Sequence, residues 1–126
     1  KVRLEERLWD AEVEELVREA KKAGTPVIVR KIYTGRALDS IKAMARKIAA
    51  RPGAVAILAV ADADQLVVAR SDDLQAGCHE AVRRITAEFG GKGGGNPDLA
   101  QAGGFPPESL EPILTALEAY FSQTVI

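Results

Sequence analysis

The sequence predicts a small α+β domain, in which a projecting amphipathic helix at the N-terminus is followed by a small α/β sheet domain with helices packed on it. Segments of helical period alternate along the chain with short β-branched or apolar runs, and glycine and proline separate them. The 126 residues, of which 47% are hydrophobic and 28% charged, are typical of one globular core. We expect an N-terminal helix over residues 1–24 and a globular unit over residues 25–126.

The first helix is predicted over residues 3–23 and ends at Gly24 and Pro26, which cannot continue it. Its apolar stripe comprises Leu8, Trp9, Val13, Leu16, Val17 and Ala20. This stripe needs cover from the globular unit, from chain upstream, or from a second copy as a helical pair. Because the pattern is already running near Lys1 without an N-cap, we expect a fragment of a longer protein.

The globular unit is predicted from its hydrophobic periods. Strands are expected at residues 27–33, 54–60 and 65–71, and helices at 37–50, 75–89 and from Ser109 to Phe121. The run AVAILAV at 54–60 is apolar throughout, as in a central strand that is covered on both faces. Asp62 and Asp64 supply a tight turn, so the strands on either side of it form a probable hairpin.

A glycine-rich loop is expected between the last two helices. Residues 90–104 read GGKGGGNPDLAQAGG and hold seven of the eleven glycines. Such a concentration indicates positive φ angles or a close approach of the backbone to something else. Backbone N–H groups in such turns cradle phosphate oxygens, and Lys92 adds a positive charge. A tight connection packed on neighbouring backbone, without a ligand, is the alternative.

Two nucleotide-binding motifs are excluded for this loop. In a Walker A loop, Lys92 would be followed by Ser or Thr, but Gly93 stands there. A dinucleotide fingerprint follows a strand, whereas this loop follows a predicted helix. Nucleotide hydrolysis and hydride transfer therefore lose support.

The run GGKGGGNPDLAQAGG closely resembles the signature of the DHH-associated domain at the C-terminus of alanyl-tRNA synthetases, usually GGKGGGRPDMAQAGG. The resemblance implies binding to the outer corner of the tRNA, dimerisation through the helical part, and a link between aminoacylation and editing. It points to a set of residues that face nucleic acid or shape that face: Gly91, Lys92, Gly93, Gly94, Gly95, Asn96, Asp98 and Gln101. Asn96 stands where the family usually has Arg, which removes one cation from the expected phosphate contact.

A basic segment is the second predicted contact with nucleic acid. Residues 30–51 hold seven Lys or Arg against one acidic residue, whereas residues 52–126 hold four against ten. Basic clusters bind polyanions, although a solvated helix face gives the same pattern. We include Arg30, Lys31 and Arg36 in the predicted site, with Tyr33 as a candidate for stacking on a base.

The remaining candidates indicate structure more than chemistry. His79 is the only histidine and stands beside the single cysteine, Cys78, and neighbours on a helix point in different directions. The carboxylates of Asp62, Asp64, Asp72 and Asp73 fit turns and a helix start. We therefore predict no catalytic residue, no metal site and no cofactor in this fragment. With one cysteine, no secretion signal and no apolar membrane span, the expected location is the cytoplasm.

The predicted function is that of a noncatalytic tRNA-binding and dimerisation domain. Its expected partners are tRNA, with tRNA-Ala as the expected species, and a second copy of the chain bound through the N-terminal helix, with no membrane. The parent protein would be an alanine–tRNA ligase or an alanyl-tRNA editing protein. Two alternatives stay open: the substrate-binding domain of a DHH-type phosphoesterase, and a purely structural dimerisation domain.

Overall fold

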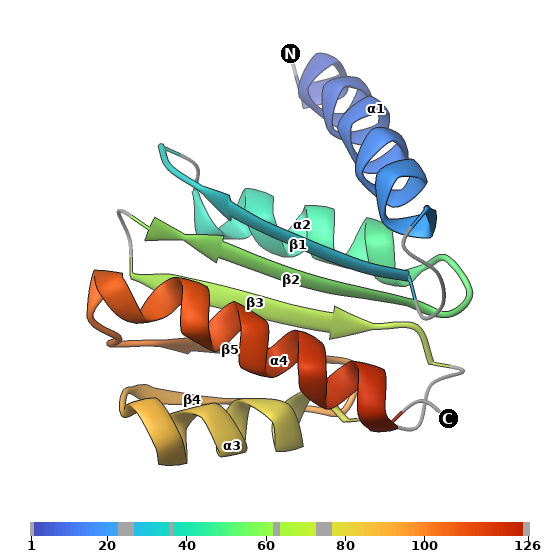
Figure 1. Ribbon diagram of the computed structural model, residues 1–126. Coiled ribbons are helices and arrows are strands. Elements are labelled where there is room, and N and C mark those ends of the chain that lie inside the picture. The colour runs from blue at the N-terminus through green and yellow to red at the C-terminus, as the bar shows by residue number, and fades with distance from the viewer. Residues whose placement is uncertain (1, 23–26, 36, 62–63, 73–76, 125–126) are drawn as a thin grey trace.

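The computed structural model describes residues 2–22, 27–35, 37–61, 64–72 and 77–124 of the chain, which form three layers (Figure 1). The elements in chain order are α1 (Val2–Lys21), β1 (Val27–Tyr33), α2 (Leu38–Ala49), β2 (Ala54–Val60), β3 (Gln65–Arg70), α3 (Cys78–Phe89), β4 (Lys92–Gly95), β5 (Leu99–Gly103), the short 3-10 helix η2 (Pro107–Ser109) and α4 (Leu110–Thr124). The predicted α+β class is confirmed. Among the described residues, no helix is long and apolar enough to cross a membrane.

One five-stranded mixed sheet forms the middle layer, with the strand order β1-β2-β3-β5-β4. Strands β1 and β2 run parallel, joined by the crossover helix α2, and all other neighbours run antiparallel. Strand β2 is buried at each of its seven positions, as its unbroken apolar run predicts. The predicted hairpin of β2 and β3 is confirmed, with Leu58 opposite Val67.

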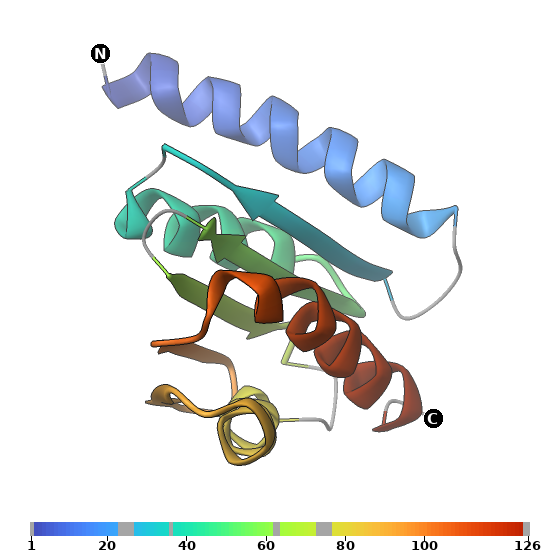
Figure 2. The same cartoon turned by 60° about the vertical axis from the view of Figure 1, so that its left-hand side comes forward.

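The two faces of the sheet carry separate cores. On one face α2 packs over β2 and β3. Its fully buried Ile41, Met44 and Ile48 belong to one hydrophobic core together with residues of α1, β1 and β2. On the other face lie α3 and α4, and Leu117 and Phe121 of α4 are buried there against the sheet. Figure 2 shows α4 crossing this second face, with α3 beside it under the far edge of the sheet.

Helix α1 packs on the globular unit in part. Val13 and Val17 are 1% and 3% exposed and join the core formed by α2 and β1. An ion pair between Arg51 and Glu14, 2.8 Å long, ties α1 to the end of α2. The C-terminal half of the predicted stripe is therefore covered within the chain. The side chains of Leu8 and Trp9 lie outside the described residues.

The expectation of a loop over residues 90–104 is wrong, because most of this segment is a β-hairpin. Strands β4 and β5 pair with Gly94 opposite Gln101, and β5 also pairs with β3. Glycine is depleted from strands, which concealed β4 in the sequence. The alternation that marks β5 is carried by alanines: Ala100 and Ala102 are buried, and Gln101 between them is half-exposed. We call β4, the turn at 96–98 and β5 the glycine hairpin.

Candidate nucleic-acid interface

The glycine hairpin forms the outer edge of the sheet and has one covered and one open face. Helix α3 packs against β4 and β5 on the side of Ala100 and Ala102. Helix α2, on the opposite side, packs mainly against β2 and β3. The residues of the hairpin on that side, Lys92, Gly94, Gln101 and Gly103, are therefore left uncovered and are exposed or half-exposed.

Three alternate glycines of β4 and its approach are required by packing inside the chain. A Cβ at Gly93 would lie 2.6 Å from the Gln101 carbonyl oxygen and 2.6 Å from a methyl carbon of Val82. A Cβ at Gly91 would lie 2.5 Å from the Gly103 carbonyl oxygen, and one at Gly95 would lie 2.5 Å from Ala100 Cα. Real Cβ atoms do not approach other atoms so closely. These glycines let the edge strand close onto β5 and α3, as the tight-connection alternative describes.

Gly94 is different from these three glycines. No atom lies within 4 Å of a Cβ built on it, and its φ is not in the left-handed region. It lies in the middle of β4, directly opposite Gln101. Since a side chain would be accommodated there, neither the backbone nor the packing of the described residues accounts for glycine at this position.

The open face of the hairpin is hollowed into a shallow groove of about 670 Å³, which we call the hairpin groove. Its lining comprises Gln65, Gly91, Lys92, Gly93, Gly94, Gln101, Ala102, Gly103 and Gly104. The polar side chains are thus one cation and two amides on a floor of exposed peptide groups. Lys92 has no ion-pair partner among the residues that the structure describes. The amide of Gln65 was missed by sequence reasoning, because only the β3–β5 pairing brings it to the hairpin.

The turn at 96–98 is held by side chains that the sequence assigned to nucleic acid. The Asn96 side-chain oxygen accepts hydrogen bonds from the backbone N–H groups of Asp98 and Leu99, at 2.9 and 3.0 Å. The Asp98 carboxylate pairs with Arg70 at 3.2 Å. The side-chain oxygen of Asn96 therefore stabilises the turn, and the side-chain NH₂ group of Asn96 can make other contacts.

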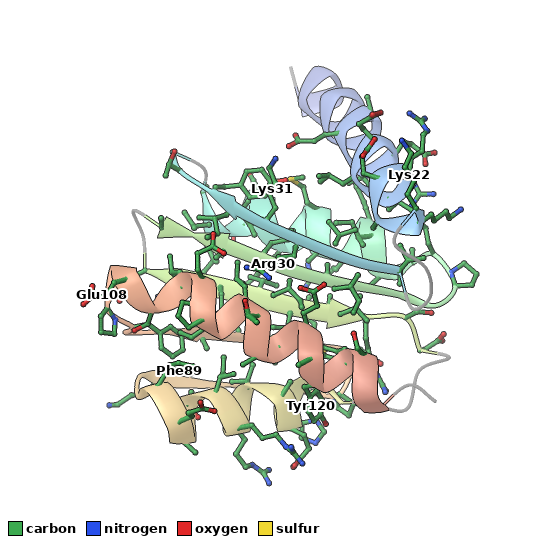
Figure 3. All side chains as sticks on the ribbon, viewed as in Figure 1. Lys22, Arg30, Lys31, Phe89, Glu108 and Tyr120 are labelled. Atoms are coloured by element: carbon green, nitrogen blue, oxygen red, sulfur yellow. The ribbon has the colours of Figure 1, made fainter. Side chains whose placement is uncertain are left out.

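The basic segment does not form one surface. Arg30 lies on the opposite face of the sheet, where it pairs with Glu111 and with Glu118 of α4 (Figure 3). Tyr33 is 7% exposed and donates a hydrogen bond to Glu12 of α1 at 3.2 Å. Lys31 is exposed on β1, the edge strand opposite the hairpin. Arg36 lies outside the described residues.

Arg30 and Tyr33 are consequently poor contacts for an RNA ligand. Using Arg30 would require breaking two ion pairs, and stacking on Tyr33 would require α1 to leave the sheet. The sequence could not show this, because the partners of both side chains come from helices distant in the chain. We keep neither residue in the interface proposed below.

The remaining titratable candidates have structural surroundings. Cys78 is fully buried, and this burial raises the pKa of its thiol to about 12, so it is not a nucleophile near neutral pH. The carboxylate of Asp64 accepts a hydrogen bond from the backbone N–H of Phe105 at 3.1 Å, which ties the β2–β3 turn to the end of β5. No group of three or more His, Cys, Asp or Glu that could hold a metal ion occurs among the described residues.

Comparison with known proteins identifies the family. The model of the DHHA1 domain matches residues 24–123, which include every strand of the sheet. The chain belongs to the DHHA1 domain family. The alanine–tRNA ligase of Geobacillus kaustophilus is 37% identical over 121 residues, which cover 90% of this chain and 14% of that enzyme. The alanine–tRNA ligase of Frankia casuarinae is 36% identical over 110 residues, which cover 80% of this chain and 12% of that enzyme.

Solved structures agree in fold. The C-Ala domain of Aquifex aeolicus alanyl-tRNA synthetase superposes with a TM-score of 0.66 at 22% identity, over 75% of this chain and 90% of that one. RecJ of Thermus thermophilus gives a TM-score of 0.69 at 15% identity, over 94% of this chain and 18% of that one. At these identities the likeness shows the fold alone. The sequence matches and the motif together identify a DHHA1 domain of the alanyl-tRNA synthetase kind, and the chain spans 14% of the length of such an enzyme.

Proposed function

We propose that this domain binds tRNA, noncatalytically, through the open face of the glycine hairpin. The observation that carries the proposal is the hairpin groove, whose floor is stripped of side chains at Gly94 and whose rim carries the unpaired cation of Lys92. Exposed peptide groups, side-chain amides and a lysine are the groups that contact phosphate and sugar in nucleic-acid complexes. Relatives that are alanine–tRNA ligases make tRNA-Ala the candidate ligand. In the parent protein the domain would support aminoacylation or editing of that tRNA.

The groove explains why a chain with a formal net charge of −1 would bind a polyanion. Lys92 is the single basic residue of the hairpin, and the nearest acidic side chain of the hairpin, Asp98, is neutralised by Arg70. Local cations govern the release of counterions, whatever the net charge of the chain. A single strong cation predicts modest affinity for the isolated domain, and affinity that falls with salt.

The test is a binding titration of the domain with tRNA-Ala and with an RNA duplex that lacks the tRNA corner, each at two salt concentrations. We expect a preference for tRNA that weakens with salt. Lys92→Ala should lower the affinity and reduce the salt slope by about one. Arg83→Ala is the matched control. Arg83 is an exposed cation that pairs with Glu80, and it lies on α3, which covers the other face of the hairpin. Equal losses in both variants, or no preference for tRNA, would refute the proposal.

We also propose that two copies of the chain associate through the N-terminal half of α1. Within the chain, α1 buries Val13 and Val17, whereas the stripe predicted from the sequence extends back to Leu8. An apolar stripe of this length on one side of a helix is suited to a helical pair. Light scattering of the chain and of the variant Leu8→Ser tests this: a monomeric wild-type chain would exclude the pairing. We also propose that the parent protein acts in the cytoplasm.

A further inference from the structure

A second hollow, of about 460 Å³, lies on the same face as the hairpin groove, beside the turn of the hairpin. We call it the turn hollow. Its polar lining residues are Arg46, Arg70, Asp72, Asn96 and Asp98. Leu99 of β5 lines it and Gln101 lines the hairpin groove. Side chains two residues apart on a strand share a face and stand roughly 7 Å apart, so the two hollows adjoin.

Two of the residues that border the turn hollow, Arg70 and Asp98, neutralise each other. Arg70, whose side chain is 13% exposed, pairs with Asp98 at 3.2 Å, and its backbone N–H donates to the Asp98 carbonyl oxygen at 3.0 Å. Asn96 is engaged through its oxygen in the turn. These contacts hold the turn that borders the hollow, and the Arg70–Asp98 pair carries no net charge.

The rim is different, because it carries one donor and one acceptor that are both unused. Arg46, in the last turn of α2, and Asp72, just after β3, are exposed and line the same hollow. Neither side chain has a hydrogen bond or ion pair with any residue in the described part of the chain, and the two side chains do not pair with each other. An arginine and a carboxylate that line one hollow without pairing with each other suit a ligand that presents both acceptors and donors.

The charge balance decides the class of ligand. The rim groups, Arg46 and Asp72, are one cation and one anion, and Arg70 and Asp98 pair with each other, so a bare phosphate gains little there. A ribonucleoside fits better, since its hydroxyls and base amino groups donate and its ring nitrogens and oxygens accept. Building on the proposed function, we propose that the turn hollow binds the sugar and base edge of one nucleotide of the same RNA that lies in the hairpin groove. Arg46 donates to that nucleotide, and the carboxylate of Asp72 accepts from it.

Asp72→Asn provides the sharpest test, because it keeps an acceptor oxygen while removing the negative charge. If Asp72 receives a hydrogen bond from the nucleotide, the weaker acceptor lowers affinity for tRNA-Ala, by roughly threefold or more. If the carboxylate merely repels nearby phosphates, removing its charge raises the affinity. A gain in affinity would therefore overturn the proposal.

The second variant is Arg46→Ala, measured beside Arg83→Ala and Lys92→Ala in the same titration. We expect Arg46→Ala to weaken tRNA binding about tenfold and Arg83→Ala to leave it unchanged. The side chains of Arg46 and Arg83 are both exposed, so the urea midpoints of these two variants should stay at the wild-type value. If Lys92→Ala weakens binding but Arg46→Ala does not, the turn hollow lies outside the interface and this proposal fails alone. If the wild-type domain shows no affinity for tRNA, the proposed function fails with it.

A DNA oligonucleotide of the same sequence and hairpin structure as a bound tRNA segment tests the role of the ribose. The wild-type domain should prefer the RNA, since only ribose offers the 2′-hydroxyl as donor and acceptor. Asp72→Asn should narrow this preference. If the ratio of the affinities for RNA and DNA is identical in wild type and variant, a sugar contact at Asp72 is contradicted.

Discussion

The substitutions Gly93→Ala and Gly94→Ala separate the structural glycines of the hairpin from the one left open to a ligand. A methyl group at Gly93 would lie 2.6 Å from the Gln101 carbonyl oxygen, 2.6 Å from Val82 and 2.7 Å from Ala102 Cβ. One of these neighbours belongs to the backbone of β5, so the strands must move apart. Overpacking of this kind costs about 1–3 kcal/mol.

At Gly94 the same methyl group meets no atom within 4 Å. Alanine there reduces the conformational freedom of the unfolded chain and should leave stability unchanged or raise it by up to about 1 kcal/mol. The two neighbouring variants should thus differ by roughly 1–4 kcal/mol in the free energy of unfolding. Urea denaturation followed by circular dichroism measures this difference.

The effect of Gly94→Ala should appear in tRNA binding and not in stability. Gly94→Ala should fold as well as wild type and bind tRNA more weakly, because the methyl group projects into the hairpin groove. A Gly94→Ala variant that is as unstable as Gly93→Ala would refute the packing analysis. A stable Gly94→Ala variant that binds tRNA normally would instead refute the role of the groove floor.

Three further perturbations test the fold and the site. Leu117→Ala, at a fully buried position of α4, should lower the free energy of unfolding by about 2–5 kcal/mol in the same urea assay; a smaller loss would contradict the core of the α4 face. Burial raises the pKa of the Cys78 thiol from 9.0 to about 12, so its contribution to stability should be complete below pH 9 and fall as pH rises towards 12. Cys78→Ala should lack this alkaline decline in stability. If stability depends on pH identically in the wild type and the variant, the buried thiol is not its cause. Asp98→Ala leaves Arg70 without the carboxylate at 3.2 Å, which should lower the thermal midpoint and weaken tRNA binding, whereas an unchanged midpoint would show that the pair does not hold the turn.

The sequence predicted the elements whose residues repeat with a clear period. The apolar run of β2, the β-branched run of β1 and the stripe of α2 each specify one structure through burial, and the structure confirms all three. The hairpin of β4 and β5 was missed, because Gly93 and its neighbours carry no side chains from which a period could be detected. Their β structure arises from pairing with β5, which no local pattern records.

The predicted site residues were separated by their tertiary surroundings. Lys92 and Gln101 share one groove because strand pairing puts both on the uncovered face. Arg30 stands one residue from Lys31 in the sequence, yet alternation along β1 sends its side chain to the α4 face, where two glutamates meet it. Gln65 and Arg46 entered only through the fold, since they reach the hairpin from β3 and α2.

Hydrogen–deuterium exchange of the domain with and without tRNA-Ala tests the central claim most directly, because it reports which backbone N–H groups the RNA covers. The edge strand β4 has β5 on one side only among the described residues, so those of its amides that point outward should exchange quickly in the free domain. We predict that tRNA slows exchange in peptides spanning residues 91–104, and leaves peptides from α3 and α4 unchanged. Protection confined to α3 and α4, or none in the hairpin under conditions where tRNA is bound, would contradict the assignment of the glycine hairpin as the RNA-binding face.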